Sequence, residues 1–222
     1  MKGKLIVIEG VDSSGKATQS ELLFKEVSKK YDTKLITFPD YKSDFSLPVR
    51  NYLRGDLGKN PEDVNAYAAS SFYAIDRYAS YKTKWGDFFE NGGVIIADRY
   101  TTSNIVHQAS KIKGDKKEFI DWLTDYEYNK LSLPVPDLVI FLDMPPESAE
   151  FLMRERKNKI TGEAQKDIHE SDGDFLRKSY NNAVSVAEIC SWHRIVCAKG
   201  NSIRSIEDIH NEILNKVKEI LD

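Results

Sequence analysis

Short apolar runs alternate with longer amphipathic stretches along the whole chain. Continuous runs of branched apolar residues, bounded by glycine or proline, are typical of strands that are buried on both faces of a sheet. Such runs predict strands at residues 4–8, 33–38, 94–97, 138–142 and 194–197. Between them, apolar residues recur at helical spacing and predict helices at 15–30, 61–90, 101–111, 116–131, 145–157, 171–190 and from 205 to the C-terminus. This alternation predicts an α/β fold, a five-stranded parallel sheet with helices on both faces.

The length and composition are those of a globular domain. The 222 residues are enough for one domain with an insertion, and at this length about 70% of the surface of the unfolded chain can be buried. Aromatic residues make up 11% and charged residues 30%, which excludes a disordered or collagen-like chain. We therefore expect a single domain over residues 1–222.

The charge balance and the cysteines restrict the partners and the compartment. With 32 basic and 35 acidic residues the formal net charge is −3, so the molecule offers no general positive field to nucleic acid or anionic lipid. No apolar run approaches the roughly 18 residues of a membrane span, and Lys2 and Lys4 precede a strand rather than a signal-peptide core. Cys190 and Cys197 fit a reducing compartment as free thiols, with one disulfide as the alternative. We expect a cytoplasmic protein with no nucleic-acid and no membrane partner.

A glycine-rich turn lies between the first strand and the first helix, where residues 10–17 read Gly-Val-Asp-Ser-Ser-Gly-Lys-Ala. The pattern G-x-x-x-x-G-K at this place predicts a phosphate-binding loop, because its N–H groups form an anion nest and Lys16 adds a mobile cation. A chance glycine-rich turn is the alternative, which the strand and helix around the motif disfavour. The residues expected to hold a triphosphate are Gly10, Val11, Asp12, Ser13, Ser14, Gly15, Lys16, Ala17 and Thr18.

Ala17 departs from this motif, which has Ser or Thr at that position to ligate Mg²⁺ through its hydroxyl. A methyl group cannot ligate a metal. Two hypotheses follow from this departure. Either Mg²⁺ is held through water and a nearby carboxylate, or Thr18 takes over the role of the missing hydroxyl.

Six motifs in a fixed order give the chain a resemblance to the thymidylate kinases, within the nucleoside monophosphate kinase group. They are Glu9-Gly10-Val11-Asp12 through Gly15-Lys16, Phe38-Pro39, Tyr73-Ala74-Ile75-Asp76-Arg77, Asp98-Arg99-Tyr100, Ser103-Asn104 through Gln108, and Pro136-Asp137-Leu138 through Leu142. The resemblance covers essentially the whole chain. It implies a kinase that transfers a phosphoryl group from Mg²⁺-ATP to dTMP, with ATP and dTMP as its small-molecule substrates.

The resemblance also assigns the residues around the acceptor phosphate. It implies that Arg77 and Arg99 hold the 5′-phosphate of dTMP, which planar guanidinium groups suit. Asp98 would hold the water shell of Mg²⁺ or orient the acceptor phosphate, at the carboxyl end of the third strand. Asp12 would accept the 3′-hydroxyl of the deoxyribose. The alternatives are a helix cap for Asp12, a solvated arginine for Arg77 and a surface ion pair for Asp98 with Arg99.

Aromatic and amide side chains are expected around the acceptor base. Tyr73 lies one helical turn before Arg77, and the resemblance places its ring against thymine. Asn104 and Gln108, also one turn apart, resemble the polar residues that read the edge of the base, since amides both donate and accept hydrogen bonds. Phe38 and Pro39 are expected beside the acceptor. His107 is left out of catalysis, because a phosphate acceptor needs no general base.

A basic segment around Gly162 is expected to form a mobile lid at about residues 154–170. The resemblance implies that such a lid closes over ATP, excludes water and stabilises the charge on the migrating phosphoryl group. Arg154 and Arg156 are the candidates within it, and Lys16, Asp98 and Arg99 complete the expected catalytic set. The alternative is a solvated surface loop.

The expected reaction is the phosphorylation of dTMP to dTDP in dTTP biosynthesis. Another nucleotide or deoxynucleoside kinase remains an alternative, because those enzymes share the phosphate loop and the lid. A nucleotide-binding protein that has lost turnover is the other alternative, which Ala17 keeps open. The resemblance also implies a homodimer, for which the apolar-rich stretch at 64–89 is a candidate surface, although its aromatic residues fit a core equally well.

Overall fold

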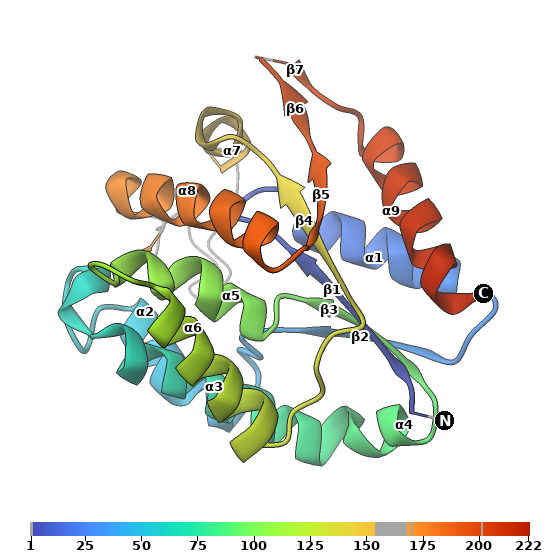
Figure 1. Cartoon of the computed structure of the whole chain (residues 1–222), viewed down its shortest axis with the longest axis horizontal. Helices are drawn as coiled ribbons and strands as arrows, with labels where there is room; N and C mark the ends of the chain where they lie inside the picture. Colours follow the sequence, from blue (N-terminus) through green and yellow to red (C-terminus); the bar gives the residue numbers. More distant parts are fainter. Residues whose placement is uncertain (1, 154–167, 170, 201) are drawn as a thin grey trace.

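A five-stranded sheet forms the centre of the computed structural model, which describes residues 2–153, 168–169, 171–200 and 202–222. Its strands lie in the order β2–β3–β1–β4–β5, and every neighbouring pair is parallel (Figure 1). The strands are β1 (Lys4–Glu9), β2 (Thr33–Thr37), β3 (Val94–Asp98), β4 (Leu138–Asp143) and β5 (His193–Val196). The predicted five-stranded parallel sheet is therefore confirmed.

Both faces of the sheet are covered, which explains why its strands are continuously apolar. Along β1, Ile6 and Ile8 belong to one buried cluster, together with side chains of α1 (Lys16–Val27) and α9 (Ile206–Leu221). Leu5 and Val7 point to the opposite face and pack in a second cluster with Trp85. All four β1 side chains are fully buried. Successive strand residues point to opposite faces, so the central residues of a strand that is buried on both faces are all apolar.

The face opposite α1 and α9 carries two layers of helices. The elements on this side are α2 (Leu47–Leu53), α3 (Ala66–Ser80), α4 (Gly86–Glu90), α5 (Thr101–His107), α6 (Lys117–Thr124) and α8 (Gly173–Ile189). Phe141 of β4 packs with Val106 and Ala183, so α5 and α8 lie directly on the sheet. A further cluster around Phe119 joins α3, α5, α6 and α8 (Figure 1). The remaining helix, α7 (Pro146–Met153), follows β4.

The helix predicted at 61–90 is interrupted in three places. Residues Pro61–Asp63 form a short 3₁₀ turn, and Val64 is extended, with φ −108° and ψ 121°. The helix α3 begins only at Ala66, where the side chain of Asn65 accepts a hydrogen bond from the N–H of Ala68. Asn65 is therefore the N-cap of α3, which begins five residues later than predicted. A π-helical turn, Tyr81–Trp85, then separates α3 from α4.

Several short elements also escaped the sequence analysis. The helix α2, the 3₁₀ turn Asp44–Ser46 before it, and the hairpin of β6 (Ala198–Lys199) with β7 (Ser202–Ile203) are too short to show a periodic pattern. Two predicted helices end in altered turns, the 3₁₀ turn Ala109–Lys111 and the π-helical turn Asp125–Lys130. The predicted lid falls mostly outside the described residues.

The structure also bears on two expectations from the sequence, which concern a membrane span and the two cysteines. Among the described residues, no helix has both the length and the apolar character that crossing a membrane requires. Cys190 and Cys197 are both free thiols, which excludes the alternative of a disulfide between them. Cys197 is buried, whereas Cys190 is exposed, so only one of the two is an interior thiol.

Candidate functional site

The phosphate loop connects the carboxyl end of β1 to the first turn of α1. Gly10 must be glycine, because a Cβ there would lie 2.5 Å from the Oγ of Ser14 and 3.0 Å from the carbonyl oxygen of Leu142. Gly15 precedes α1 in the left-handed region, with φ 92°, which a residue without a Cβ adopts at no steric cost. The motif therefore lies where the sequence analysis expects it, between a buried strand and a helix N-terminus.

Lys16 folds back onto the loop. Its Nζ donates a hydrogen bond of 2.6 Å to the carbonyl oxygen of Val11, and the side chain is buried. Burial lowers the pKa of Lys16 to about 7, and the positive charge of Arg99 contributes in the same direction. The loop thus holds a lysine that is short of negative charge, as expected of a site that receives phosphates.

A cavity of about 440 Å³ opens beside the loop. Its polar lining consists of residues 12–19 of the loop and α1, Asp98 at the end of β3, and Arg99 directly after that strand. Apolar side chains also line the cavity, namely Met144, Leu152, Ile203, Ile206 and Ile209, and Arg204 lies among them. The polar lining suits the phosphates of a nucleotide, and the apolar side chains suit its base and sugar.

Asp98 contributes an unsatisfied carboxylate oxygen to this cavity. The residue is the last of β3 and is buried, and its Oδ1 has no hydrogen-bond partner within the described part of the chain. A buried polar atom without a partner marks a place where a ligand or ion completes the site. Asp98 is therefore placed where the sequence analysis expects a group that faces a metal or phosphate.

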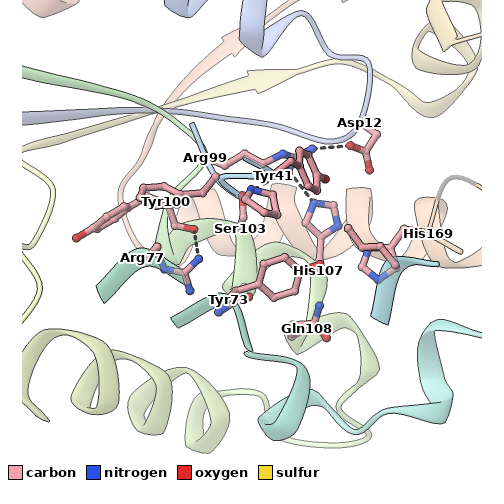
Figure 2. Close-up of a pocket in the computed structure, with 14 residues that line it drawn as sticks. Asp12, Tyr41, Tyr73, Arg77, Arg99, Tyr100, Ser103, His107, Gln108 and His169 are labelled. Atoms are coloured by element: carbon pink, nitrogen blue, oxygen red, sulfur yellow. Dashed lines mark hydrogen bonds and ion pairs between the residues drawn. The ribbon is translucent and has the colours of Figure 1, made fainter. Parts of the chain in front are cut away.

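A second pocket adjoins the first, and Figure 2 shows the side chains that line it. Tyr73 and Arg77 come from α3, and Asn104 and His107 come from α5. The side chains common to both cavities are Asp12, Phe38, Pro39, Tyr41 and Arg99. The structure therefore brings the predicted acceptor residues of three separate chain segments to one place, next to the phosphate loop.

Arg99 lies at the junction of the two cavities. It has φ 71°, a conformation that costs a non-glycine residue energy and is found most often at functional sites. Its Nη2 donates a 2.5 Å hydrogen bond to Oδ1 of Asp12, and its Nη1 donates to Nε2 of His107 at 3.1 Å (Figure 2). Asp12 and Arg99, which the sequence analysis assigned to the acceptor, therefore contact each other.

Arg77 differs from the expectation, because its charge is already met inside the protein. Its Nε and Nη2 donate hydrogen bonds of 2.6 and 2.5 Å to the two carboxylate oxygens of Glu127, and both side chains are buried. Only Nη1 points elsewhere, 3.5 Å from the carbonyl oxygen of Tyr100 (Figure 2). The sequence predicts two equivalent arginines on the acceptor phosphate, and this pairing of Arg77 with Glu127 was not expected. Glu127 lies in a charged stretch that is typical of a solvated helix face, so the sequence does not indicate that it pairs with Arg77.

The other residues assigned to the acceptor base are placed around the same pocket. Tyr73 lies one turn before Arg77 on α3, and Asn104 donates from Nδ2 to the carbonyl oxygen of Ser70 at 3.3 Å. Gln108 is buried and its Oε1 has no hydrogen-bond partner among the described residues. An amide oxygen held in this way can accept a hydrogen bond from a ligand.

Two histidines also line the pocket. Burial, followed by the charge of Arg99, lowers the pKa of His107 to about 3, so its ring is neutral at physiological pH. This neutral ring agrees with leaving His107 out of catalysis. His169, which the sequence analysis did not single out, lies with its Nε2 2.8 Å from the hydroxyl of Tyr52. Arg154 and Arg156 lie outside the described residues.

A phosphate loop at the centre of a parallel sheet, beside a second pocket that shares an arginine with it, defines a P-loop nucleoside monophosphate kinase. Comparisons with known proteins narrow this class. The family model described as thymidylate kinase matches residues 8–213. The chain belongs to the thymidylate kinase family.

Individual proteins that are similar to this chain are also described as thymidylate kinases. A probable thymidylate kinase of Pyrococcus horikoshii is 30% identical over 221 residues, an alignment that covers 100% of this chain and 98% of that protein. A probable thymidylate kinase of Thermococcus onnurineus is 31% identical, with 97% and 98% covered. The solved thymidylate kinase of Candida albicans shares the fold, with a TM-score of 0.72, 23% identity, and coverage of 98% of this chain and 92% of that one.

Proposed function

We propose that this protein transfers the γ-phosphoryl group of ATP to dTMP and so forms dTDP and ADP, a step in dTTP biosynthesis. The observation that carries the proposal is the pair of adjoining cavities that share Asp12 and Arg99. One cavity suits a nucleoside triphosphate and the other a nucleoside monophosphate, so the two phosphate groups meet at Arg99. Membership of the thymidylate kinase family supports dTMP as the acceptor.

The reaction needs positioning and charge neutralisation rather than proton removal. An oxygen of the dTMP phosphate forms a bond to the γ-phosphorus of ATP, while the bond from that phosphorus to the β-phosphate oxygen breaks and ADP leaves. Lys16 and the loop N–H groups hold the donor phosphates, and Arg99 holds the acceptor phosphate. Arg154 and Arg156 as lid residues, over residues 154–170, stay a prediction, as does the single domain over 1–222.

The acceptor pocket suits the three parts of dTMP. Tyr73 provides an aromatic ring for the base, and Gln108 provides a buried amide for its edge. Arg77 is assigned to the base through Nη1 rather than to the phosphate, because Glu127 already balances its charge. Asp12 is assigned to the 3′-hydroxyl, as a hydrogen-bond acceptor next to Arg99. The walls are completed by Phe38, Pro39 and Asn104.

The residues beside the loop also fit Mg²⁺. Carboxylate oxygens are the ligands that this ion prefers, and Asp98 offers a buried one without a partner among the described residues. Within the described ranges no three His, Cys, Asp or Glu side chains form a ready-made metal cluster, which suits an ion that arrives with ATP. When bound, Mg²⁺ neutralises charge on the phosphates. Asp98 is the group on this chain that would hold its water shell.

Replacement of Ala17 tests how the missing hydroxyl affects the metal. The Ala17→Thr variant is expected to bind Mg²⁺-ATP at a Mg²⁺ concentration about fivefold lower than the wild type, because one added oxygen ligand is worth about 1 kcal/mol. Calorimetric titration of ATP at several Mg²⁺ concentrations measures this shift. Ala17→Val has the same shape without the hydroxyl and serves as the control. Equal behaviour of the threonine and valine variants would mean that the hydroxyl does not reach the metal.

Removal of the aromatic ring at Tyr73 is expected to weaken acceptor binding selectively. Stacking of a base on an aromatic ring is worth about 1–3 kcal/mol, so Tyr73→Ala should raise the KM for dTMP about tenfold or more. The KM for ATP should change little. Tyr73→Phe, which keeps the ring, is the matched control and should stay close to the wild type. Steady-state kinetics decide, and similar KM values for the alanine and phenylalanine variants would exclude stacking.

ATP binding is expected to change the protonation of Lys16. The pKa of about 7 in the free protein should rise when phosphates bring negative charge next to the ammonium group. At pH 8 the free lysine is mostly neutral, so binding should take up about one proton, whereas at pH 6 it should take up almost none. Calorimetry in buffers of different ionisation enthalpy measures the uptake. If Lys16→Met takes up as many protons as the wild type, the lysine is not the group that takes them up.

A homodimer is part of the proposal. Tyr67, Ile75 and Tyr78 of α3 are exposed apolar side chains with 40, 43 and 37% of their surface accessible, and they recur on one side of this helix. A second copy of the chain is the proposed cover for that surface. Sedimentation velocity of the wild type and of an Ile75→Glu variant distinguishes a dimer from a monomer.

The direct test of the reaction is a coupled assay of ADP release. With ATP present, ADP is expected to form only when dTMP is added, and dUMP, CMP and thymidine should be poorer acceptors. ATP binding without dTMP-dependent ADP release would support the alternative of a nucleotide-binding protein that has lost turnover. Faster release with one of the other acceptors would support another nucleotide or nucleoside kinase.

A further inference from the structure

Glu127 is a fully buried carboxylate that the reaction itself does not use. It belongs to the π-helical turn Asp125–Lys130, which continues α6 with one extra residue in the turn. Such turns are often found at functional sites, because they rotate a side chain out of the regular helical sequence. Here the turn directs one acidic side chain into the protein, while Asp125 pairs with Lys130 at the surface.

Four hydrogen bonds end on the two oxygens of Glu127. Arg77 supplies two of them, from Nη2 to Oε1 at 2.5 Å and from Nε to Oε2 at 2.6 Å. Asn104 donates from Nδ2 to Oε1 at 3.2 Å, and Thr101 donates from its hydroxyl to Oε2 at 2.7 Å. Two of these three donors, Arg77 and Asn104, line the acceptor pocket. One carboxylate therefore links α3 and α5 behind the wall of that pocket.

The charge of Glu127 determines whether the inner end of the pocket attracts anions. A buried guanidinium without a counter-ion would attract any anion that reaches it, including the phosphate of a wrongly oriented nucleotide. Paired with Glu127, Arg77 keeps only Nη1 for a ligand and carries no net charge with its partner. The phosphate of the acceptor is then left with Arg99 as the accessible arginine among the described residues of the pocket.

We propose that Glu127 is a positioning residue that determines acceptor specificity. It fixes Arg77 and Asn104 against the base and cancels the charge of Arg77, so that the inner end of the pocket takes a neutral base and rejects a phosphate. This inference rests on the proposed function, because it assigns the pocket to a nucleoside monophosphate. A purely structural ion pair would stabilise the protein and leave acceptor binding unchanged.

Two variants separate the charge of Glu127 from its position. Glu127→Gln keeps the size but turns one acceptor oxygen into a donor that opposes Arg77, and Glu127→Asp keeps the charge but withdraws it by one methylene. Both are expected to raise the KM for dTMP about tenfold or more while kcat and the KM for ATP change less than threefold. In Glu127→Gln alone, inorganic phosphate should compete with dTMP at a concentration about tenfold lower than in the wild type.

Asp143→Asn is the control for the loss of a buried carboxylate that pairs with an arginine, although Arg194 itself is partly exposed. Asp143 is a buried carboxylate that accepts hydrogen bonds of 2.9 and 2.7 Å from Arg194, and it lines neither cavity. Its variant should lose thermal stability, as the Glu127 variants do, and keep the wild-type KM for dTMP.

The same kinetic assays distinguish failure of the inference from failure of the proposed function. If the wild type releases no ADP in response to dTMP, the proposed function is wrong. If the wild type is active and either Glu127 variant binds dTMP within twofold of the wild-type KM, the inference is overturned. It is also overturned if Asp143→Asn raises the KM for dTMP as much as they do. Should Glu127→Gln not fold, Glu127→Asp alone decides by these criteria.

Discussion

Replacement of Arg99 by methionine is expected to lower kcat/KM for dTMP about a thousandfold, because one preorganised donor to the transition state is worth about 10²–10³ in rate and Arg99 supplies several. Its guanidinium lies at the junction of the two cavities, so it is placed to hold the acceptor phosphate and the charge that develops during transfer. Methionine keeps the apolar stem of the side chain and removes the guanidinium group, with its charge and its donors.

The loss at Arg99 should appear in kcat as well as in KM, since the interaction strengthens in the transition state. Stopped-flow or coupled ADP-release kinetics at saturating ATP measure both constants. Arg54→Met is the control, because Arg54 is exposed and pairs with Asp56 away from both cavities. A change in the KM alone would limit Arg99 to ground-state binding, and an unchanged kcat/KM would remove it from the site.

Lys16→Met is expected to reduce kcat at least about a hundredfold and to weaken ATP binding less strongly. In the free protein Lys16 donates to the carbonyl oxygen of Val11, and that contact is exchanged for the outer phosphates when ATP binds. The variant loses this cation at the point where the bond to the leaving phosphate breaks. The helix N-terminus and the N–H groups of the loop remain, so part of the ATP affinity should survive.

Single-turnover kinetics with preformed protein–ATP complex separate the chemical step from binding at Lys16. Lys25→Met is the control, since Lys25 is an exposed lysine in the last turn of the same helix. A variant of Lys16 with wild-type single-turnover rate would show that the motif only binds the nucleotide. That outcome would favour the alternative of a P-loop protein adapted for binding.

The hydrophobic pattern was enough to predict the sheet, because β1, β3 and β4 are buried on both faces and carry polar residues only at their ends. It was not enough to place the start of α3. Asn60 and Asn65 are both good caps by residue type, and only the extended backbone at Val64 decides between them. The two π-helical turns have no signal in a single sequence, since one extra residue shifts the period without changing the composition.

In the site, too, the sequence predicts features formed by one continuous segment and does not predict contacts between distant segments. The phosphate loop is one continuous segment, so its motif and its place between strand and helix were readable together. Glu127 is 50 residues from Arg77 in the sequence, and an acidic residue between aromatic ones fits a solvated helix as well as a buried ion pair. The burial of that carboxylate follows from the packing of α3 against α5, which no local pattern contains.

The contact between Asp12 and Arg99 also bears on the order of events during turnover. Both residues line both cavities, and Arg99 donates a hydrogen bond to Asp12. A nucleotide in either cavity competes for Asp12 or for Arg99. When the first nucleotide breaks the contact between them, the other residue becomes available to the second nucleotide. We therefore expect the two substrates to bind synergistically, and by thermodynamic reciprocity each should increase the affinity for the other by the same factor.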